Sequence, residues 1–138
     1  MSDNALATST TSSNAIVTLI SRILLTLLFI PAGFNKLTSL AGTAEYFAAK
    51  SLPLPTVTAV IVGLVELVGG LAVLFGFKTR YAAILLGVFT IGAALVAHLV
   101  PWDQANQTNF FKNLAIAGGF FVLAQHGAGT LSVDAKLR

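Results

Sequence analysis

Glu66 is the residue of this sequence whose type and surroundings most favour chemistry. It lies near the middle of an apolar run, residues 58–77, which is about as long as a helix that crosses a bilayer. A carboxylate at that depth costs about 2.5–3.5 kcal/mol on insertion scales, so it usually faces the interior of a helix bundle and has a partner. Gly63 and Gly70 share a helix face with Glu66 by their spacing, and would let a neighbouring helix come close.

Arg22 is the predicted partner of Glu66. It lies in another apolar run, residues 15–34, about 10 Å from the start of that run at 1.5 Å per residue. We therefore predict a buried ion pair between Arg22 and Glu66. In the alternative interpretation the long side chain of Arg22 snorkels back to the lipid headgroups.

A second group of polar residues lies near the ends of the apolar runs, on the side away from both termini. Lys36 follows the first run, His98 ends the third, and Lys112 with Asn113 begins the fourth. We predict that these four residues line one pocket, in which their donors bind a quinone headgroup or a small anion. His98 would exchange protons, since imidazole titrates near neutral pH. The alternative is that both lysines anchor separately in the headgroups while His98 caps its helix.

The sequence excludes several other kinds of site. It has no cysteine, which rules out thiolate metal sites, disulfides and a redox dithiol. His98 and His126 are separated by most of the membrane thickness of about 30 Å, so they cannot ligate one haem. We predict no metal site and no intrinsic cofactor, and catalytic residues cannot be assigned because no nucleophile lies beside a base.

Composition identifies the class of protein. Of the 138 residues, 56% are hydrophobic and 9% are charged, whereas a soluble domain carries about 25% charged residues. The chain therefore has too little charge to cover a surface that faces water, and it is predicted to be an integral membrane protein. The net charge of +3 is dispersed, so nucleic acid is not an expected partner.

The apolar runs predict an all-α membrane protein, a four-transmembrane-helix bundle. A short surface helix is expected at 43–50, between the first two spans. Residues 1–14, rich in Ser, Thr, Ala and Asn, are predicted to be a disordered tail. Residues 15–127 form the membrane domain and 128–138 a polar tail. The four predicted spans are 15–34, 56–77, 81–100 and 110–125.

The charges beside the spans predict the orientation. With four spans both termini lie on one side, which carries Lys78, Arg80, Lys136 and Arg138. The other side carries Lys36, Lys50 and Lys112. The positive-inside rule therefore places both termini in the cytoplasm.

Matching pieces are spread in order over most of the chain, and together they resemble the DoxX family of small bacterial membrane proteins. The resemblance implies a four-helix inner-membrane protein. Some members are linked to thiosulfate–quinone oxidoreduction, and others to membrane complexes that handle oxidative or thiol stress. The pieces are Arg22 with its apolar run, 33–36, Gly42-Thr43 with Tyr46, Pro53, Glu66 with Gly70, 76–80, His98, 110–113, 118–119 and 127–129.

These observations predict an accessory or quinone-interacting component of a membrane redox or oxidative-stress system. Such a chain is at most a subunit of a quinone-linked oxidoreductase. Its expected partners are the lipid bilayer, a quinone or small anion, proteins of a redox complex and a second copy of the chain in a homo-oligomer. Two alternatives stay open: a small proton-coupled transporter in which Glu66 is alternately protonated and paired, and a structural membrane subunit without a ligand.

Overall fold

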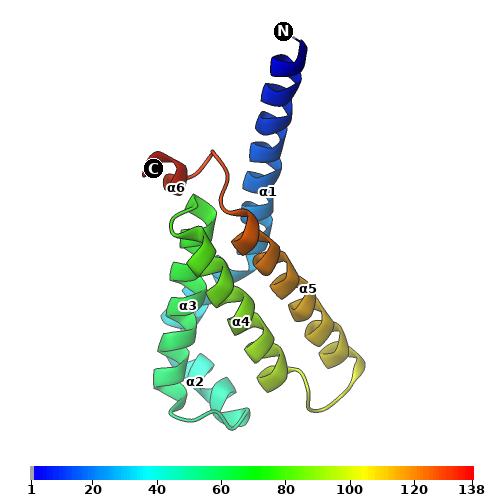
Figure 1. Cartoon of the computed structure of the whole chain (residues 1–138). Coiled ribbons are helices and arrows are strands. Elements are labelled where there is room, and N and C mark those ends of the chain that lie inside the picture. Colours follow the sequence, from blue (N-terminus) through cyan, green and yellow to red (C-terminus); the bar gives the residue numbers. More distant parts are fainter. Residues whose placement is uncertain (1) are drawn as a thin grey trace.

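The structure, a computed structural model, describes the backbone of residues 2–138 and the side chains from Asn14 onward. All regular secondary structure in that range is helical (Figure 1), which confirms the all-α fold class. Helix α1 runs through most of the stretch predicted as a disordered tail, whose side chains before Asn14 lie outside the described part. The division into tail and domain stays a prediction. The helices are α1 (Ser2–Thr38), α2 (Leu40–Ala49), α3 (Pro55–Phe75), α4 (Thr79–Ala97), α5 (Gln104–His126) and α6 (Val133–Lys136).

Three of these helices are long and apolar enough to cross a membrane: residues Asn14–Thr38 of α1, and all of α3 and of α4. Their bounds differ from those of the first three predicted spans by at most four residues. The fourth long helix, α5, has 23 residues, about 34 Å at 1.5 Å per residue. Its first turns are polar, so the apolar part of α5 is shorter than the helix.

Local sequence sets the ends of the spanning helices. Pro55 begins α3, where its missing N–H and fixed φ cost nothing. Gly76 ends α3 with φ at +70°, a conformation that glycine adopts without strain. Asp103 caps α5 by accepting a hydrogen bond from the backbone N–H of Asn106 at 2.8 Å.

The helices pack mainly in two pairs, α1 with α3 and α4 with α5, and contacts between α3 and α4 join the pairs. The core lies where the pairs meet. Phe29 of α1 contacts Phe120 of α5 edge to face, with 5.3 Å between ring centroids. Apart from this contact, α1 and α5 pack against each other much less than the other pairs of neighbouring long helices do.

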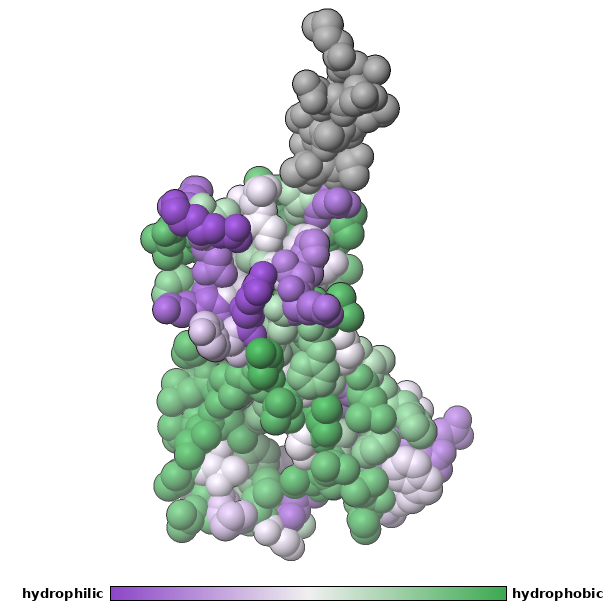
Figure 2. All heavy atoms as spheres, viewed as in Figure 1, coloured by the Kyte–Doolittle hydropathy of each residue, from purple (hydrophilic) through white to green (hydrophobic). Residues whose placement is uncertain are grey.

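The surface is apolar over most of its height, as a protein in a bilayer requires. Figure 2 shows hydrophobic residues over the greater part of one face, with hydrophilic residues gathered toward the end that carries the C-terminus. Large apolar side chains such as Leu24, Val88 and Val122 are more than half exposed. Exposure on this scale would be unfavourable in water and is expected where lipid covers the helices.

Both ends of the chain lie at one end of the bundle, and α2 lies at the other together with the connection from α4 to α5 (Figure 1). These are called the terminal end and the α2 end below. Helix α2 follows α1 after the single residue Ser39 and packs mainly against α3.

Candidate functional site

Glu66 forms an ion pair with Lys36. The Lys36 Nζ donates to Glu66 Oε2 at 3.0 Å, and the exposed fractions of the two side chains are 26% and 8%. The predicted pair between Arg22 and Glu66 is therefore wrong, although the inference that a buried Glu66 needs a cationic partner holds. Lys36 is predicted to line the pocket with His98 and not to pair with Glu66, but α1 stays helical to Thr38 and keeps Lys36 beside α3.

Close packing of α1 on α3 brings the two charges together. A Cβ added to Gly33 would lie 2.7 Å from the carbonyl oxygen of Gly63, and one added to Gly70 would lie 2.8 Å from the Cγ1 atom of Ile30. Real Cβ atoms do not approach other heavy atoms this closely, so only glycines allow this spacing. The contacts span positions 33–37 of α1 and 63–67 of α3, and Lys36 and Glu66 lie within these two stretches.

Arg22 is buried, with 1% of its surface exposed, and its guanidinium binds backbone carbonyls. It donates to Val73 at 3.0 Å and Leu74 at 2.7 Å at the end of α3. It also donates to Ala128 at 2.8 Å and Leu131 at 2.9 Å, beyond α5. Val73 lies seven residues from Glu66, about 10 Å along α3, so Arg22 sits too near the terminal end to reach Glu66. The snorkelling alternative is wrong too, because this guanidinium is enclosed by protein.

Asp134 lies in the segment that follows α5, which we call the C-terminal segment, and it binds this segment to the start of α4. Its carboxylate accepts hydrogen bonds from the backbone N–H groups of Lys78 at 2.7 Å and Thr79 at 3.0 Å, at the start of α4. Burial raises the pKa of Asp134, but the hydrogen bonds from Thr79 and Lys78 and the charge of Arg138 outweigh it, so that the pKa lies below its ordinary value.

A cavity of about 560 Å³ lies at the α2 end, and we call it the lysine cavity. Each of the helices α1 to α5 contributes to its lining. Its volume falls within the range of about 300–1,000 Å³ that is usual for small-molecule sites. The polar side chains used below are Lys36, Lys50, Glu66, His98, Lys112 and Asn113.

The lysine cavity is rich in hydrogen-bond donors. Three lysines face one glutamate, which leaves positive charge in excess when Glu66 is ionised. His98 Nδ1 is buried and makes no hydrogen bond to any residue that the structure describes. A buried polar atom without a partner is costly, and Nδ1 is closed off from the cavity as well as from the outer surface.

The four residues predicted to line one pocket, Lys36, His98, Lys112 and Asn113, all line the lysine cavity. That they bind a ligand stays a prediction. Asn113 is partly engaged, since its Nδ2 lies 3.4 Å from the carbonyl oxygen of Thr90. Sequence reasoning missed Lys50, which enters the cavity after α2 and donates to the Ala97 carbonyl at 3.1 Å. The sequence signal for this position was the pair of prolines after Lys50, Pro53 and Pro55, which indicates that the chain turns there.

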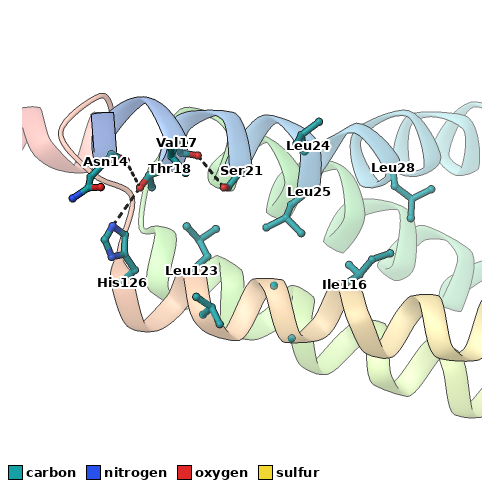
Figure 3. Close-up of a pocket in the computed structure, with 13 residues that line it drawn as sticks. Asn14, Val17, Thr18, Ser21, Leu24, Leu25, Leu28, Ile116, Leu123 and His126 are labelled. Atoms are coloured by element: carbon teal, nitrogen blue, oxygen red, sulfur yellow. Dashed lines mark hydrogen bonds between the residues drawn. The ribbon is translucent and has the colours of Figure 1, made fainter. Parts of the chain in front are cut away.

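A second hollow, of about 790 Å³, runs between α1 and α5, and we call it the α1–α5 groove. Figure 3 shows Leu25, Leu28 and Leu123 directed into the space between the two helices. His126 lies at the terminal end of this groove, where its Nε2 is 3.3 Å from the Thr18 hydroxyl. His98 and His126 therefore line different hollows. Within residues 14–138, no cluster of three or more metal-ligating side chains occurs.

The chain is similar to a known family and to several curated proteins. A family model described as DoxX matches residues 17–99. The "Inner membrane protein YqjF" of Escherichia coli is 44% identical over 119 residues, which cover 86% of this chain and 90% of that protein. The "Inner membrane protein YphA" of the same organism is 35% identical, over 91% of this chain and 93% of that protein. The "Putative oxidoreductase CatD" of Bacillus subtilis is 33% identical over 59% of this chain and 60% of its own length. No solved structure matches at a comparable significance.

Proposed function

The chain belongs to the DoxX family, and from that premise we propose that it is an accessory, quinone-interacting component of a membrane redox or oxidative-stress system. In this proposal the lysine cavity holds the quinone headgroup. The E. coli relatives named as inner membrane proteins support a location in the inner membrane. The proposal also keeps both termini in the cytoplasm, so that the lysine cavity lies toward the outer face.

The observation that carries the proposal is the excess of hydrogen-bond donors in the lysine cavity, which three lysines and His98 line beside one carboxylate, Glu66. A quinone headgroup presents two carbonyl oxygens, which accept hydrogen bonds and donate none. Imidazole and ammonium groups are matched donors for such oxygens. When bound, a quinone supplies the two-electron redox chemistry, and the electrons come from a partner protein.

The residues of the chain bind, orient and exchange protons in this proposal. Lys112, an exposed residue of α5, would bind one end of the headgroup, and His98 the other. Glu66 holds Lys36 in place through the 3.0 Å contact. His98 gives or takes a proton as the redox state of the headgroup changes, since each ring nitrogen of an imidazole can carry a proton.

Two other functions stay in view. A proton-coupled transporter is favoured by one observation, the Lys36–Glu66 pair in a cavity, because protonation of Glu66 would release Lys36. Movement of a solute into liposomes along a proton gradient would identify it. A structural subunit without a ligand is expected to have a fully packed interior. The cavity of 560 Å³ counts against this function.

Binding of a quinone headgroup tests the proposal directly. Protein in nanodiscs would be titrated with a quinone that lacks a tail, and quenching of the single tryptophan, Trp102, followed. We expect saturable binding that His98→Ala weakens by about tenfold or more, the effect of losing a hydrogen bond to a charged or polarised group. Mass spectrometry of lipophilic molecules that co-purify with the protein would supply the identity of a natural ligand.

Lys112→Gln and Lys136→Gln form a matched pair, since both lysines are exposed but only Lys112 lines the cavity. Lys112→Gln should weaken binding, and Lys136→Gln should leave it unchanged. Equal binding by wild type, His98→Ala and Lys112→Gln would contradict the proposal, provided that thermal unfolding shows all three to be folded.

A further inference from the structure

The lysine cavity and the α1–α5 groove follow the same faces of the same two helices. On α1, the groove is lined at positions 14, 17, 18, 21, 24, 25 and 28, and the cavity at 28, 29, 32 and 36. Steps of three and four residues keep one helix face. On α5, positions 109, 112 and 113 of the cavity continue into 116, 119, 123 and 126 of the groove with the same spacing.

Leu28 is the residue at which the two hollows meet, because it lines both. It is 48% exposed on the side that faces lipid. Behind it, toward the core, the contact between Phe29 and Phe120 closes the space between α1 and α5. A molecule can therefore pass from the cavity to the groove only along the lipid-facing side, past Leu28.

The groove is apolar next to the cavity and polar at its other end. From Leu28 to Leu24 on α1, and opposite on α5 at Ile116, its walls are aliphatic (Figure 3). Ser21, Thr18 and His126 make the terminal end polar. The distance from Leu28 to Ser21 is about 10 Å along α1, which suits a short stretch of hydrocarbon chain.

Two neighbouring glycines of α5, Gly118 and Gly119, line the groove. A Cβ added to Gly119 would lie 3.2 Å from Leu25 of α1, whereas one added to the exposed Gly118 would meet no atom within 4 Å. A leucine at Gly118 would therefore occupy space at the lipid-facing edge of the groove without displacing protein atoms. Few van der Waals contacts hold α1 to α5 here, and a ligand chain would supply the missing ones.

We propose that the α1–α5 groove holds the hydrocarbon tail of the molecule whose headgroup lies in the lysine cavity. The ligand is then a long-tailed amphiphile of the membrane, such as a prenylated quinone, and it enters from the bilayer past Leu28. This inference rests on the proposed function, and it excludes a small water-soluble anion as the natural ligand.

The test compares two probes with the same quinone headgroup, one without a tail and one with a decyl tail. Three variants carry the same change, Gly→Leu, at glycines whose added Cβ meets no atom within 4 Å. Gly118→Leu fills the groove, Gly92→Leu fills the lysine cavity, and Gly42→Leu on the exposed surface of α2 is the control. All are measured in nanodiscs of one lipid composition, because partition of the decyl probe into lipid then raises its apparent affinity equally in every variant.

We expect Gly118→Leu to weaken binding of the decyl probe by about fivefold or more, a typical effect of overfilling a packed site, and to leave the tailless probe unaffected. Gly92→Leu should weaken both probes, and Gly42→Leu neither. Unchanged binding of the decyl probe to Gly118→Leu would overturn the tail site and leave the headgroup site intact. A change in oligomeric state of Gly118→Leu, with decyl binding preserved, would assign the groove to a second copy of the chain. If neither probe binds saturably to the wild type, both the headgroup site and the tail site are refuted.

Discussion

Lys36→Met should destabilise the protein more than Glu66→Gln does, although both changes remove the same ion pair. The reason is the unequal burial of the two partners, with 8% of the Glu66 side chain exposed and 26% of the Lys36 side chain. A lysine left alone can turn its flexible stem and bring its ammonium to water in the cavity. A carboxylate left alone in the middle of α3 has no such route.

The sizes follow from these environments. Removing one partner of a buried pair typically costs about 3–5 kcal/mol in the free energy of unfolding. The cost of Lys36→Met should lie near the lower end of this range, because both partners line the lysine cavity. Glu66→Gln should cost about 1.5 kcal/mol, near the lower end for a lost hydrogen bond to a charged group. The double variant Lys36→Met with Glu66→Leu should cost less than Lys36→Met alone, since no charge then remains buried.

Unfolding would be measured in mixed micelles by titration with a denaturing detergent, with Trp102 fluorescence as the signal. Lys136→Met, at an exposed lysine of the terminal end, is the control for loss of a positive charge. A cost of Glu66→Gln equal to or above that of Lys36→Met would refute the argument from burial. A double variant whose cost equals the sum of the costs of Lys36→Met and of Glu66→Leu, each measured alone, would show that the residues are not coupled.

Four further predictions concern other parts of the bundle. Arg22→Met should cost about 3 kcal/mol or more, because buried carbonyls lose their donors, and it should expose the C-terminal segment to proteases; a segment equally protected in the variant would contradict the role of Arg22. The lowered pKa of Asp134 means that its contribution to stability is full above its unfolded pKa and is lost as the pH falls below the ordinary value of 3.8; hydrogen exchange at the start of α4 should rise in that acid range, and Asp134→Asn should remove the pH dependence. Gly33→Leu should separate α1 from α3 and cost about 3 kcal/mol or more, against almost nothing for Gly42→Leu in thermal unfolding. A reporter that works only in the cytoplasm should be active when it is fused to the C-terminus. Activity of a reporter that works only in the periplasm, fused at the same place, would reverse the orientation.

The sequence predicted the helices well because apolar length dominates in a membrane protein. Runs of about 20 apolar residues leave few alternatives to a spanning helix, and α3 and α4 begin and end close to the expected residues. α5 was harder, because its polar first turns, from Gln104 onward, read as a loop. Those turns are helical because Asp103 caps the helix, a local signal that hydropathy does not contain.

Four of the six polar residues of the candidate site were grouped from the sequence, but Lys50 was missed and the partner of Glu66 was wrong. Lys36, His98, Lys112 and Asn113 could be grouped because alternating spans bring their ends to one side. The partner of Glu66 could not be found this way. Hydropathy gives the relative depth of two residues on different helices only to within about the length of a lysine side chain. Arg22 was misjudged for a related reason: the carbonyls that satisfy it belong to backbone, and backbone acceptors leave no mark in the sequence.

The hydrogen bonds of Arg22 have a consequence for how the protein is made. Arg22 belongs to the first span to enter the membrane, yet two of the carbonyls that it binds belong to Ala128 and Leu131, beyond the last long helix. During translation one side of the guanidinium must therefore stay hydrated, or be held by the insertion machinery, until residues 128–131 have left the ribosome. Release of a mature bundle is thus coupled to synthesis of these residues, and a nascent protein that stops short of Ala128 presents a buried cation with only part of its hydrogen bonds made, which membrane quality control can recognise.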